Sequence, residues 1–371
     1  MTRYIIGRLL ATIPVLGVVA LFTFALLHFT PGDPAAIIAG DHGTAEDIAA
    51  IRIKLGLERP LYVQLGIWLS NLAQGDLGTS LFSDHSVTSL IIDRMEPTIA
   101  LMVMTQIMSI LIAVPLGILA AWKANTWIDR VVMIFMVLGL AVPVFWLGFM
   151  LIWLFGLKLS LLPVAEYRSF TEGIGVFFSH ILLPSISLSV VYIALVGRMT
   201  RASMLEVLKE DYIRTAQAKG LAQKSVLLRH ALKNASLPIV TIIGIGLAAL
   251  ISGAVVTESV FAIPGLGRLV VDSILHRDYP IIQGLILLVT AVYVFVNLGI
   301  ELPTDDLLRV IITKYFSDKQ IEISPKISEY IIKNIERSYE KVFKFIKEID
   351  DLSLSSGKSI NINLIKKVLN K

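Results

Sequence analysis

The chain has 371 residues and contains no cysteine. That absence excludes disulfide bonds, thiolate metal ligands and cysteine nucleophiles. No two of its six histidines are spaced as metal ligands, so we expect neither a metal site nor a cofactor. The formal net charge is only +4, which gives no reason to expect a nucleic-acid partner.

Asp, Glu, Lys and Arg are also missing from the interiors of six long apolar runs. The runs are residues 9–30, 98–122, 131–157, 176–197, 239–257 and 281–300. Hydrophobic residues make up 55% of the chain, and its mean hydropathy is +0.76. Because apolar runs of about 18 residues or more mark membrane-spanning helices, we predict an all-α, polytopic membrane protein with six transmembrane helices.

The lack of charge inside these runs bears on mechanism. Transporters that are driven by protons or ions usually need an ionisable relay within the membrane. Since the runs hold no such group, we expect the energy source to act from outside the bilayer. An integral membrane enzyme would need a cluster of polar residues in or near the runs, and the sequence shows none. A channel, which needs no energy source, stays open as an alternative.

A strongly polar interval, residues 198–238, separates the fourth and fifth apolar runs. It reads RMTRASMLEVLKEDYIRTAQAKGLAQKSVLLRHALKNASLP, and its Lys and Arg residues clearly outnumber its acids. Because an excess of Lys and Arg marks cytoplasmic loops, we place this interval and the short turn at 123–130 in the cytoplasm. With six crossings, both chain termini are then cytoplasmic, and residues 31–96 lie outside.

The middle of this loop predicts a short helix. Residues 211–219 have helical character, and Gly220 is a natural helix stop. Ala216 and Gly220 stand one turn apart, so we expect a face almost free of side chains, which the backbone of another protein can approach closely. A further helix is expected at residues 225–235, with Pro238 opening the next span.

The same loop resembles the signature of permease subunits of binding-protein-dependent ABC importers. The family pattern is Glu-Ala-Ala, three residues, Gly and a later Leu-Pro; here those positions hold Arg214-Thr215-Ala216, Gly220 and Leu237-Pro238. The Arg in place of Glu and the longer distance to Leu-Pro resemble the peptide and nickel branch. The resemblance implies that the loop docks on a separate ATPase subunit. The residues implied in this coupling are Arg214, Thr215, Ala216, Ala218, Gly220, Leu237 and Pro238.

Three further strings carry the same resemblance. Residues 31–34 read PGDP and residues 75–80 read GDLGTS, as in the N-terminal region of dipeptide and oligopeptide permeases. Residues 257–268 read TESVFAIPGLGR, which resembles a family string between the last two spans. On this basis, Glu258 and Phe261 are candidates for contact with the translocation path or the binding protein.

The resemblance covers Met1 to about Ile300 and implies a type I ABC importer permease in a bacterial inner (plasma) membrane. Such a subunit is not an enzyme. It lies in membrane lipid and pairs with a homologous second permease. Two ABC ATPase subunits act at its cytoplasmic face, and an extracytoplasmic substrate-binding protein delivers the cargo. The implied cargo is a di- or oligopeptide, with nickel and glutathione as open alternatives.

The polar segment that follows the first run predicts two short helices. Thr44 and Asp47 are typical of an N-cap and its capping-box partner, and the helix that they begin is expected to end at Gly56. Pro60 predicts the start of the second helix.

Residues 301–371 lack alanine and hold a single glycine, whereas the apolar runs are rich in both. Their apolar residues recur at helical spacing, and Ser324-Pro325 is typical of a helix start. We therefore predict a small soluble domain of at least three helices. Leu307-Leu308 and residues 315–321 and 335–338 resemble the helical lid of the AAA+ module in the DnaA replication-initiator family.

In that family the arginine that corresponds to Arg337 senses bound nucleotide. No Walker A motif or nucleotide-binding core precedes it here, so Arg337 is expected to have nothing to sense. The abrupt change at Glu301 indicates either a fusion of two unrelated genes or an artefact of sequence assembly. The expected divisions are residues 1–96 (first span and outer segment), 97–300 (permease core) and 301–371 (helical tail).

Overall fold

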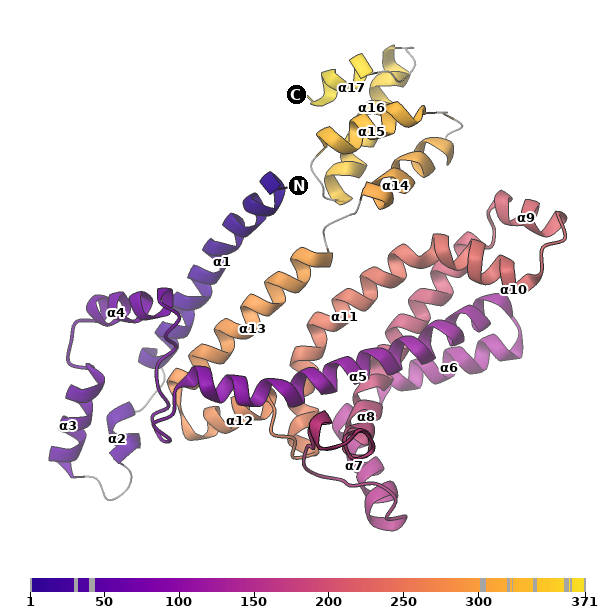
Figure 1. Ribbon diagram of the computed structural model, residues 1–371. Coiled ribbons are helices and arrows are strands. Elements are labelled where there is room, and N and C mark those ends of the chain that lie inside the picture. Colours follow the sequence, from indigo (N-terminus) through magenta and orange to yellow (C-terminus); the bar gives the residue numbers. More distant parts are fainter. Residues whose placement is uncertain are drawn as a thin grey trace. The chain divides into compact units, whose positions relative to one another are not determined.

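The computed structural model describes residues 2–29, 33–39, 44–300, 305–318, 321, 323–335, 339–356, 360 and 362–369. Throughout these ranges the regular structure is helical, and the β pairing is limited to an isolated bridge between Thr79 and Ser86. The chain divides into two compact units, one of residues Leu16–Tyr293 and one of Met1–Val15 with Val294–Lys371 (Figure 1).

The helices before the tail are α1 (Thr2–Phe29), α2 (Pro34–Ala39), α3 (Ala45–Leu55), α4 (Leu61–Ala73), α5 (Val87–Trp122), α6 (Trp127–Ala141), α7 (Val144–Leu151) with a π-helical continuation (Ile152–Lys158), α8 (Ile174–Val207), α9 (Asp211–Ala218), α10 (Gln223–Ser225) with a π-helical turn (Val226–Ala231), α11 (Leu232–Val260), α12 (Leu266–His276) and α13 (Tyr279–Ile300). A short 3₁₀ turn (Phe170–Glu172) precedes α8.

The larger unit is built on the contact between α5 and α8, which is its most extensive helix pair. A column of small buried residues lies on each helix: Thr105, Ser109, Ala113 and Gly117 on α5, and Ser185, Ser189, Gly197 and Thr200 on α8. Ser109 Oγ lies 3.5 Å from the carbonyl oxygen of Ser189, and a Cβ on Gly117 would lie 2.7 Å from that of Gly197. The pairing advances in the same direction along both helices, so α5 and α8 run parallel. Small residues permit this close approach within a membrane.

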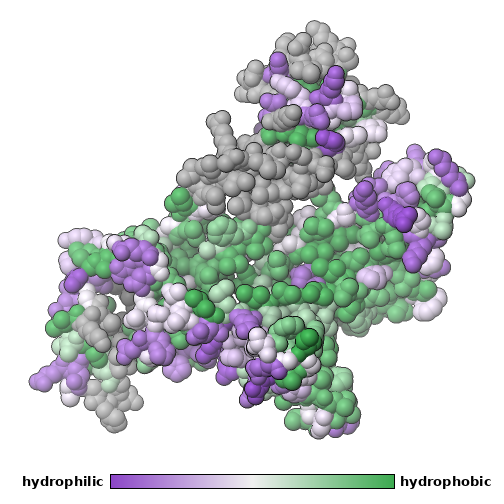
Figure 2. All heavy atoms as spheres, in the orientation of Figure 1, coloured by the Kyte–Doolittle hydropathy of each residue, from purple (hydrophilic) through white to green (hydrophobic). Residues whose placement is uncertain are grey.

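The prediction of an all-α membrane protein is confirmed in its coarse form. Among the described residues, four helices are long and apolar enough to cross a membrane, and a bent helix pair makes a fifth if it counts as one span. Residues Thr12–Ala25 of α1 form a shorter apolar helix. Hydrophobic side chains cover the flanks of α5 and α6, and hydrophilic ones gather around α9 and around α3 (Figure 2). The number of six spans stays a prediction.

The run at residues 131–157, expected as the third span, is not one continuous helix, and its crossing of the membrane as a single span stays a prediction. α6 ends at Ala141, α7 begins at Val144, and the pair is bent by 100°. Proline lacks the N–H that would continue the helix, and it disfavours helical geometry in the residue before it. Val142, directly before Pro143, accordingly has extended backbone angles (φ −81°, ψ 123°).

Three helix boundaries also differ from expectation. α5 begins already at Val87, with Ser86 as its N-cap, so Pro97 lies inside the helix. α8 does not end at the membrane run but continues to Val207. α11 contains Pro238 rather than starting at it. Helices in membrane proteins tolerate interior prolines because neighbouring groups satisfy the freed carbonyl.

The capping signals between α1 and α5 are confirmed. The Thr44 hydroxyl accepts from Asp47 N, and the Asp47 carboxylate accepts from Thr44 N, which completes a capping box at the start of α3. Gly56 closes that helix in the left-handed region (φ 69°). Pro60 is the residue before α4, as expected.

The tail has four helices among its described residues: α14 (Asp305–Asp318), α15 (Pro325–Asn334), α16 (Tyr339–Ser356) and α17 (Ile362–Leu369). Ser324 and Pro325 begin α15, as predicted. Apolar residues from all four helices are buried, among them Leu308, Ile312, Phe316, Ile331, Ile346, Ile349 and Ile365. Arg337 lies outside the described residues, and the resemblance of the tail to an AAA+ lid stays a prediction.

Candidate functional site

The candidate site is the helix α9 in the polar loop between α8 and α11. Its end is fixed by a six-residue hydrogen-bond motif: Leu221 N donates to Ala216 O (3.3 Å), and Gly220 N donates to Gln217 O (2.9 Å). Gly220 has φ +75°. This is the Schellman arrangement, in which the left-handed residue is usually glycine because it has no Cβ. The predicted helix and its stop at Gly220 are both confirmed.

One face of α9 is anchored to the protein's own core. Ile213 is fully buried, and Ala216 is 7% exposed. They belong to an apolar cluster formed with the end of α8 and the start of α11, whose other members include Met204, Val207, Val226, Leu227, Ala231 and Ala235. On the same side, Asn234 Nδ2 donates to Tyr212 Oη over 2.7 Å. α9 is therefore held in a defined position by both packing and a hydrogen bond.

The placement of Ala216 differs from the expected one. Ile213 and Ala216 share a helix face because residues three apart lie on the same side. That face is covered by the chain itself, so it offers no approach to another protein's backbone, whereas Gly220 lies beyond the helix and is exposed. Ala216 thus holds α9 in place in this structure.

The outward face of α9 carries three other residues of the predicted coupling set. Arg214, Thr215 and Ala218 are exposed, and the Arg214 side chain retains 73% of its accessible surface. Arg214 pairs with Asp211 at 3.2 Å, but both side chains are exposed, and such pairs contribute little to stability. Arg214 is consequently available to a partner.

The Leu-Pro pair lies within α11, as its sixth and seventh residues, and not at the start of the helix. Pro238 is exposed, and Leu237 is half-buried. Their neighbours Ala235 and Ile239 belong to the apolar cluster that anchors α9. Leu237 and Pro238 therefore lie next to the apolar cluster that anchors α9.

A second polar site lies at the opposite end of α11, around the fully buried carboxylate of Glu258. Thr98 Oγ1 donates to Glu258 Oε1 (2.6 Å), and Arg268 N donates to Glu258 Oε2 (3.0 Å). Thr98 Oγ1 also accepts from Leu266 N (2.8 Å). The first N–H groups of a helix have no partner within the helix. Side chains from α5 and α11 supply those partners for α12.

The glycines of the 257–268 string fit this capping arrangement. A Cβ on Gly265 would meet the Glu258 carboxylate, and a Cβ on Gly267 would lie 2.5 Å from Val255 Cα. Phe261 is 2% exposed, and its ring packs against Gly148 of α7, where an added Cβ would lie 3.2 Å from it. Both candidate contact residues are thus buried within the chain, and the contacts that the sequence assigned to them stay predictions.

Residues 75–80 also lie at the end of the helices that holds Glu258 and α12. Ser80 Oγ donates to Asp278 Oδ2 over 2.5 Å, and Leu81 N donates to Asp278 Oδ1 over 3.3 Å. Gly78 (φ 87°) lies against Pro280. The sequence interpretation missed this pairing because Ser80 and Asp278 are 198 residues apart; a buried aspartate needs partners, but only the fold reveals which.

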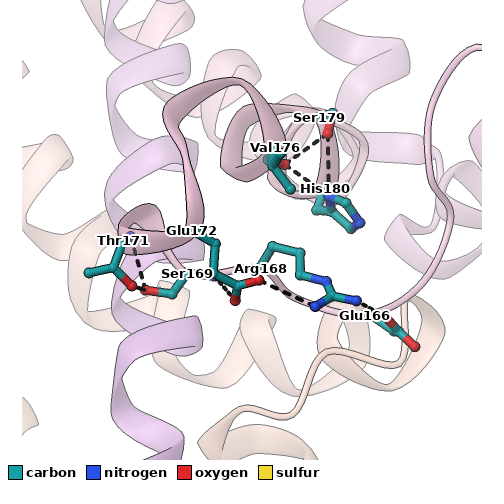
Figure 3. A network of polar contacts seen from close by, with 8 residues as sticks. All are labelled: Glu166, Arg168, Ser169, Thr171, Glu172, Val176, Ser179 and His180. Atoms are coloured by element: carbon teal, nitrogen blue, oxygen red, sulfur yellow. Dashed lines mark hydrogen bonds and ion pairs between the residues drawn. The ribbon is translucent and has the colours of Figure 1, made fainter.

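The loop before α8 is ordered by local polar contacts (Figure 3). Arg168 bridges Glu166 and Glu172, each at 3.3 Å. Glu172 also closes a capping box with Ser169. His180 Nδ1 lies 2.8 Å from the carbonyl oxygen of Val176 in its own helix. Because the charged side chains are largely exposed, the network shapes the loop and builds no enclosed site.

Some buried polar atoms among the described residues have no hydrogen-bond partner. They are Thr105 Oγ1, both amide atoms of Gln106, Ser185 Oγ and Tyr279 Oη. Thr105 and Ser185 belong to the facing columns of α5 and α8. Since buried polar groups are normally paired, the hydrogen-bonding capacity of these atoms is unmet within the described residues.

Comparison with known proteins agrees with this architecture. Residues 113–302 match the family described as binding-protein-dependent transport system inner membrane component, and residues 1–102 match the N-terminal region of the same kind of component. The tail after residue 302 lies outside both matches.

Three curated relatives match over nearly their whole length and over 81% of this chain. A probable peptide ABC transporter permease of Sinorhizobium fredii is 48% identical, with 96% of its length covered. A dipeptide transport system permease of Alkalihalophilus pseudofirmus is 39% identical (97% covered), and a glutathione transport system permease of Escherichia coli is 42% identical (96% covered). On these matches, the chain belongs to the family of inner membrane components of binding-protein-dependent transport systems.

Proposed function

We propose that this chain is the permease subunit of an ATP-driven importer of di- or oligopeptides. The observation that carries the proposal is the 48% identity to a probable peptide permease over 96% of that protein. Permease subunits of this family are not catalytic, and ATP hydrolysis occurs in separate ATPase partners. In the type I arrangement that we propose, a homologous second permease completes the membrane part, two ATPase subunits bind at the cytoplasmic face, and an extracytoplasmic binding protein delivers the cargo.

We assign the ATPase contact to the outward face of α9. Arg214, Thr215 and Ala218 are exposed there, while Ile213 and Ala216 fix the helix to the core. A short helix that is anchored to the core on one side and exposed on the other can transmit a displacement caused by a bound partner to α8 and α11. This division of roles supports docking on α9.

The unpaired polar atoms support a polar cargo. A buried donor or acceptor without a partner costs about 1–3 kcal/mol, and Gln106 has both its amide oxygen and its amide nitrogen unpaired. An amide side chain can donate to a peptide carbonyl and accept from a peptide N–H at the same time. Gln106 is therefore a candidate for contact with the backbone of a passing peptide.

Glutathione is the second candidate cargo, because a glutathione permease is 42% identical over 96% of its length. Glutathione is itself a short peptide, so the same amide contacts suit it. Nickel stays an alternative cargo.

The test begins with purification of the tagged chain from membranes, followed by reconstitution of the purified complex with its binding protein in vesicles. ATPase subunits and a second permease should co-purify, and ATP should drive uptake of labelled di- or oligopeptides. Uptake of glutathione or nickel in preference to peptides would replace the cargo assignment. Solute flux without any ATPase partner would overturn the proposal in favour of a channel.

A further inference from the structure

A buried ion pair joins α6 to α8 near the polar loop. Arg201 Nε donates to Asp129 Oδ1 (2.6 Å), and Arg201 Nη2 donates to Asp129 Oδ2 (2.7 Å). The Asp129 side chain is only 5% exposed, and that of Arg201 is 24% exposed. Such two-point contacts between guanidinium and carboxylate fix orientation as well as distance.

The start of α6 holds Asp129 in place. Asp129 lies in the first turn of the helix, where carboxylates interact favourably with the helix dipole. Its Oδ2 also accepts from Asn125 N over 3.0 Å, so the carboxylate closes the turn between α5 and α6. The aspartate is therefore a rigid attachment point at the loop-side end of α6.

Arg201 stands on the segment of α8 that supports α9. The helix continues without a break beyond Arg201 to Val207. Met204 and Val207 lie in the apolar cluster that contains Ile213 and Ala216 of α9. A displacement of α9 would thus act on the same end of α8 that carries the ion pair.

Among the described residues, the other contacts between α6 and α8 are apolar and include no hydrogen bond or ion pair. Gly139 packs on Val190, and Met136 fills the space beside Gly197. The opposite side of α6 is exposed, as the accessible surface of Val131, Ile134 and Leu138 shows. Apolar surfaces of this kind can slide, so the ion pair is the contact that fixes how α6 follows α8.

We propose that the Asp129–Arg201 pair is a positioning element for coupling, which makes α6 move with the end of α8 when an ATPase displaces α9. The inference rests on the proposed function and adds to it a contact outside the loop signature. Through α6, the pair extends the displacement to the bend at Pro143.

The experiment uses the complete transporter in vesicles and measures peptide molecules imported per ATP hydrolysed. Asp129→Asn and Arg201→Met each remove one charge, and the exchange Asp129→Arg with Arg201→Asp restores opposite charges. Arg168→Met is the matched control because it breaks an exposed pair. We expect both single variants to retain their ATPase subunits and to import about fivefold fewer peptides per ATP, within the usual range of coupling factors. The exchange should recover at least part of the loss, and the control should match the wild type.

A merely structural role would lower transport and ATP hydrolysis in the same proportion, and that result would overturn the proposal. An unchanged number of peptides imported per ATP in both single variants would also overturn the proposal. If the single variants do not insert into the membrane, the number of peptides imported per ATP is measured for Arg201→Lys instead. Lysine keeps the charge but cannot form the two-point contact, so the proposal predicts the same loss for this variant. Failure of the proposed function would look different, since the wild type itself would then lack ATPase subunits or ATP-driven uptake.

Discussion

The conformation of Gly220 determines which substitutions can test docking. A large side chain at Gly220 would fill the space in front of α9, but it would also force an L-residue into φ +75°. Loss of transport would then have two explanations, a blocked surface and a strained helix end. Ala218 is exposed on α9 and carries no such strain, so it separates the two.

We predict that Ala218→Trp prevents docking of the ATPase without unfolding α9. A clash that costs about 2 kcal/mol weakens binding about thirtyfold. The measurement is the amount of ATPase that co-purifies with the chain, together with peptide uptake. Ala49→Trp, at an exposed position of α3, is the control and should behave as the wild type. Normal co-purification of ATPase with Ala218→Trp would remove α9 as the docking site.

The second prediction at this scale concerns the cap of α12. Thr98→Val keeps the shape of the side chain but removes the hydroxyl that donates to Glu258 and accepts from Leu266 N. Glu258 Oε1 and Leu266 N then each lose the partner that Thr98 supplies, which costs about 1–3 kcal/mol. We expect a lower Tm of the purified protein in detergent.

Thr98→Ser retains the hydroxyl and serves as the comparison, with a Tm close to that of the wild type. If the valine and serine variants unfold at the same temperature, the hydrogen bonds of Thr98 do not stabilise this end of the protein.

At the scale of helices, local signals were predicted well and tertiary ones were not. The capping box at Thr44 and the stop at Gly220 depend on a few adjacent residues, so the sequence contains all that is needed. The burial of Ala216 and the capping by Glu258 depend on partners in other helices. Neither hydropathy nor a family pattern shows which neighbour a side chain meets.

The bend at Pro143 is a second feature that the sequence alone does not predict. Proline indicates that a helix is disturbed, but interior prolines at Pro97 and Pro238 leave α5 and α11 continuous. Whether a proline ends a helix depends on what the two halves pack against. Here α7 packs through Gly148 on Val260 of α11 and on Phe261, the residue that follows α11.

The orientation of the helices can be tested by cysteine labelling, because the chain has no native cysteine. Lys224→Cys lies in the polar loop, and Ser83→Cys lies at the opposite end of the helices; both positions are exposed. From the excess of basic residues in the loop, we predict that an impermeant thiol reagent labels Ser83→Cys in intact cells and labels Lys224→Cys only after the cells are opened. Labelling of Lys224→Cys in intact cells would reverse the orientation.

At the scale of the whole chain, the tail stands apart in composition and in family. It lies beyond residue 302, where the family match ends, and it has its own apolar core. We propose that it takes no part in transport. We predict that replacing residues 305–371 with a short polar segment keeps peptide uptake at or above the wild-type level, at equal amounts of inserted protein. A loss of uptake under that condition would assign the tail a role.

The parallel packing of α5 and α8 restricts the path of the chain between them. Two neighbouring helices that run in the same direction both start on one side of the membrane and finish on the other. The chain that connects them must return through the full thickness of the bilayer, which means an odd number of passages. α6 has 15 residues, or about 22 Å of helix, against about 30 Å of hydrocarbon. We therefore expect α6 and α7 to make this return as a single passage, in spite of the 100° bend between them.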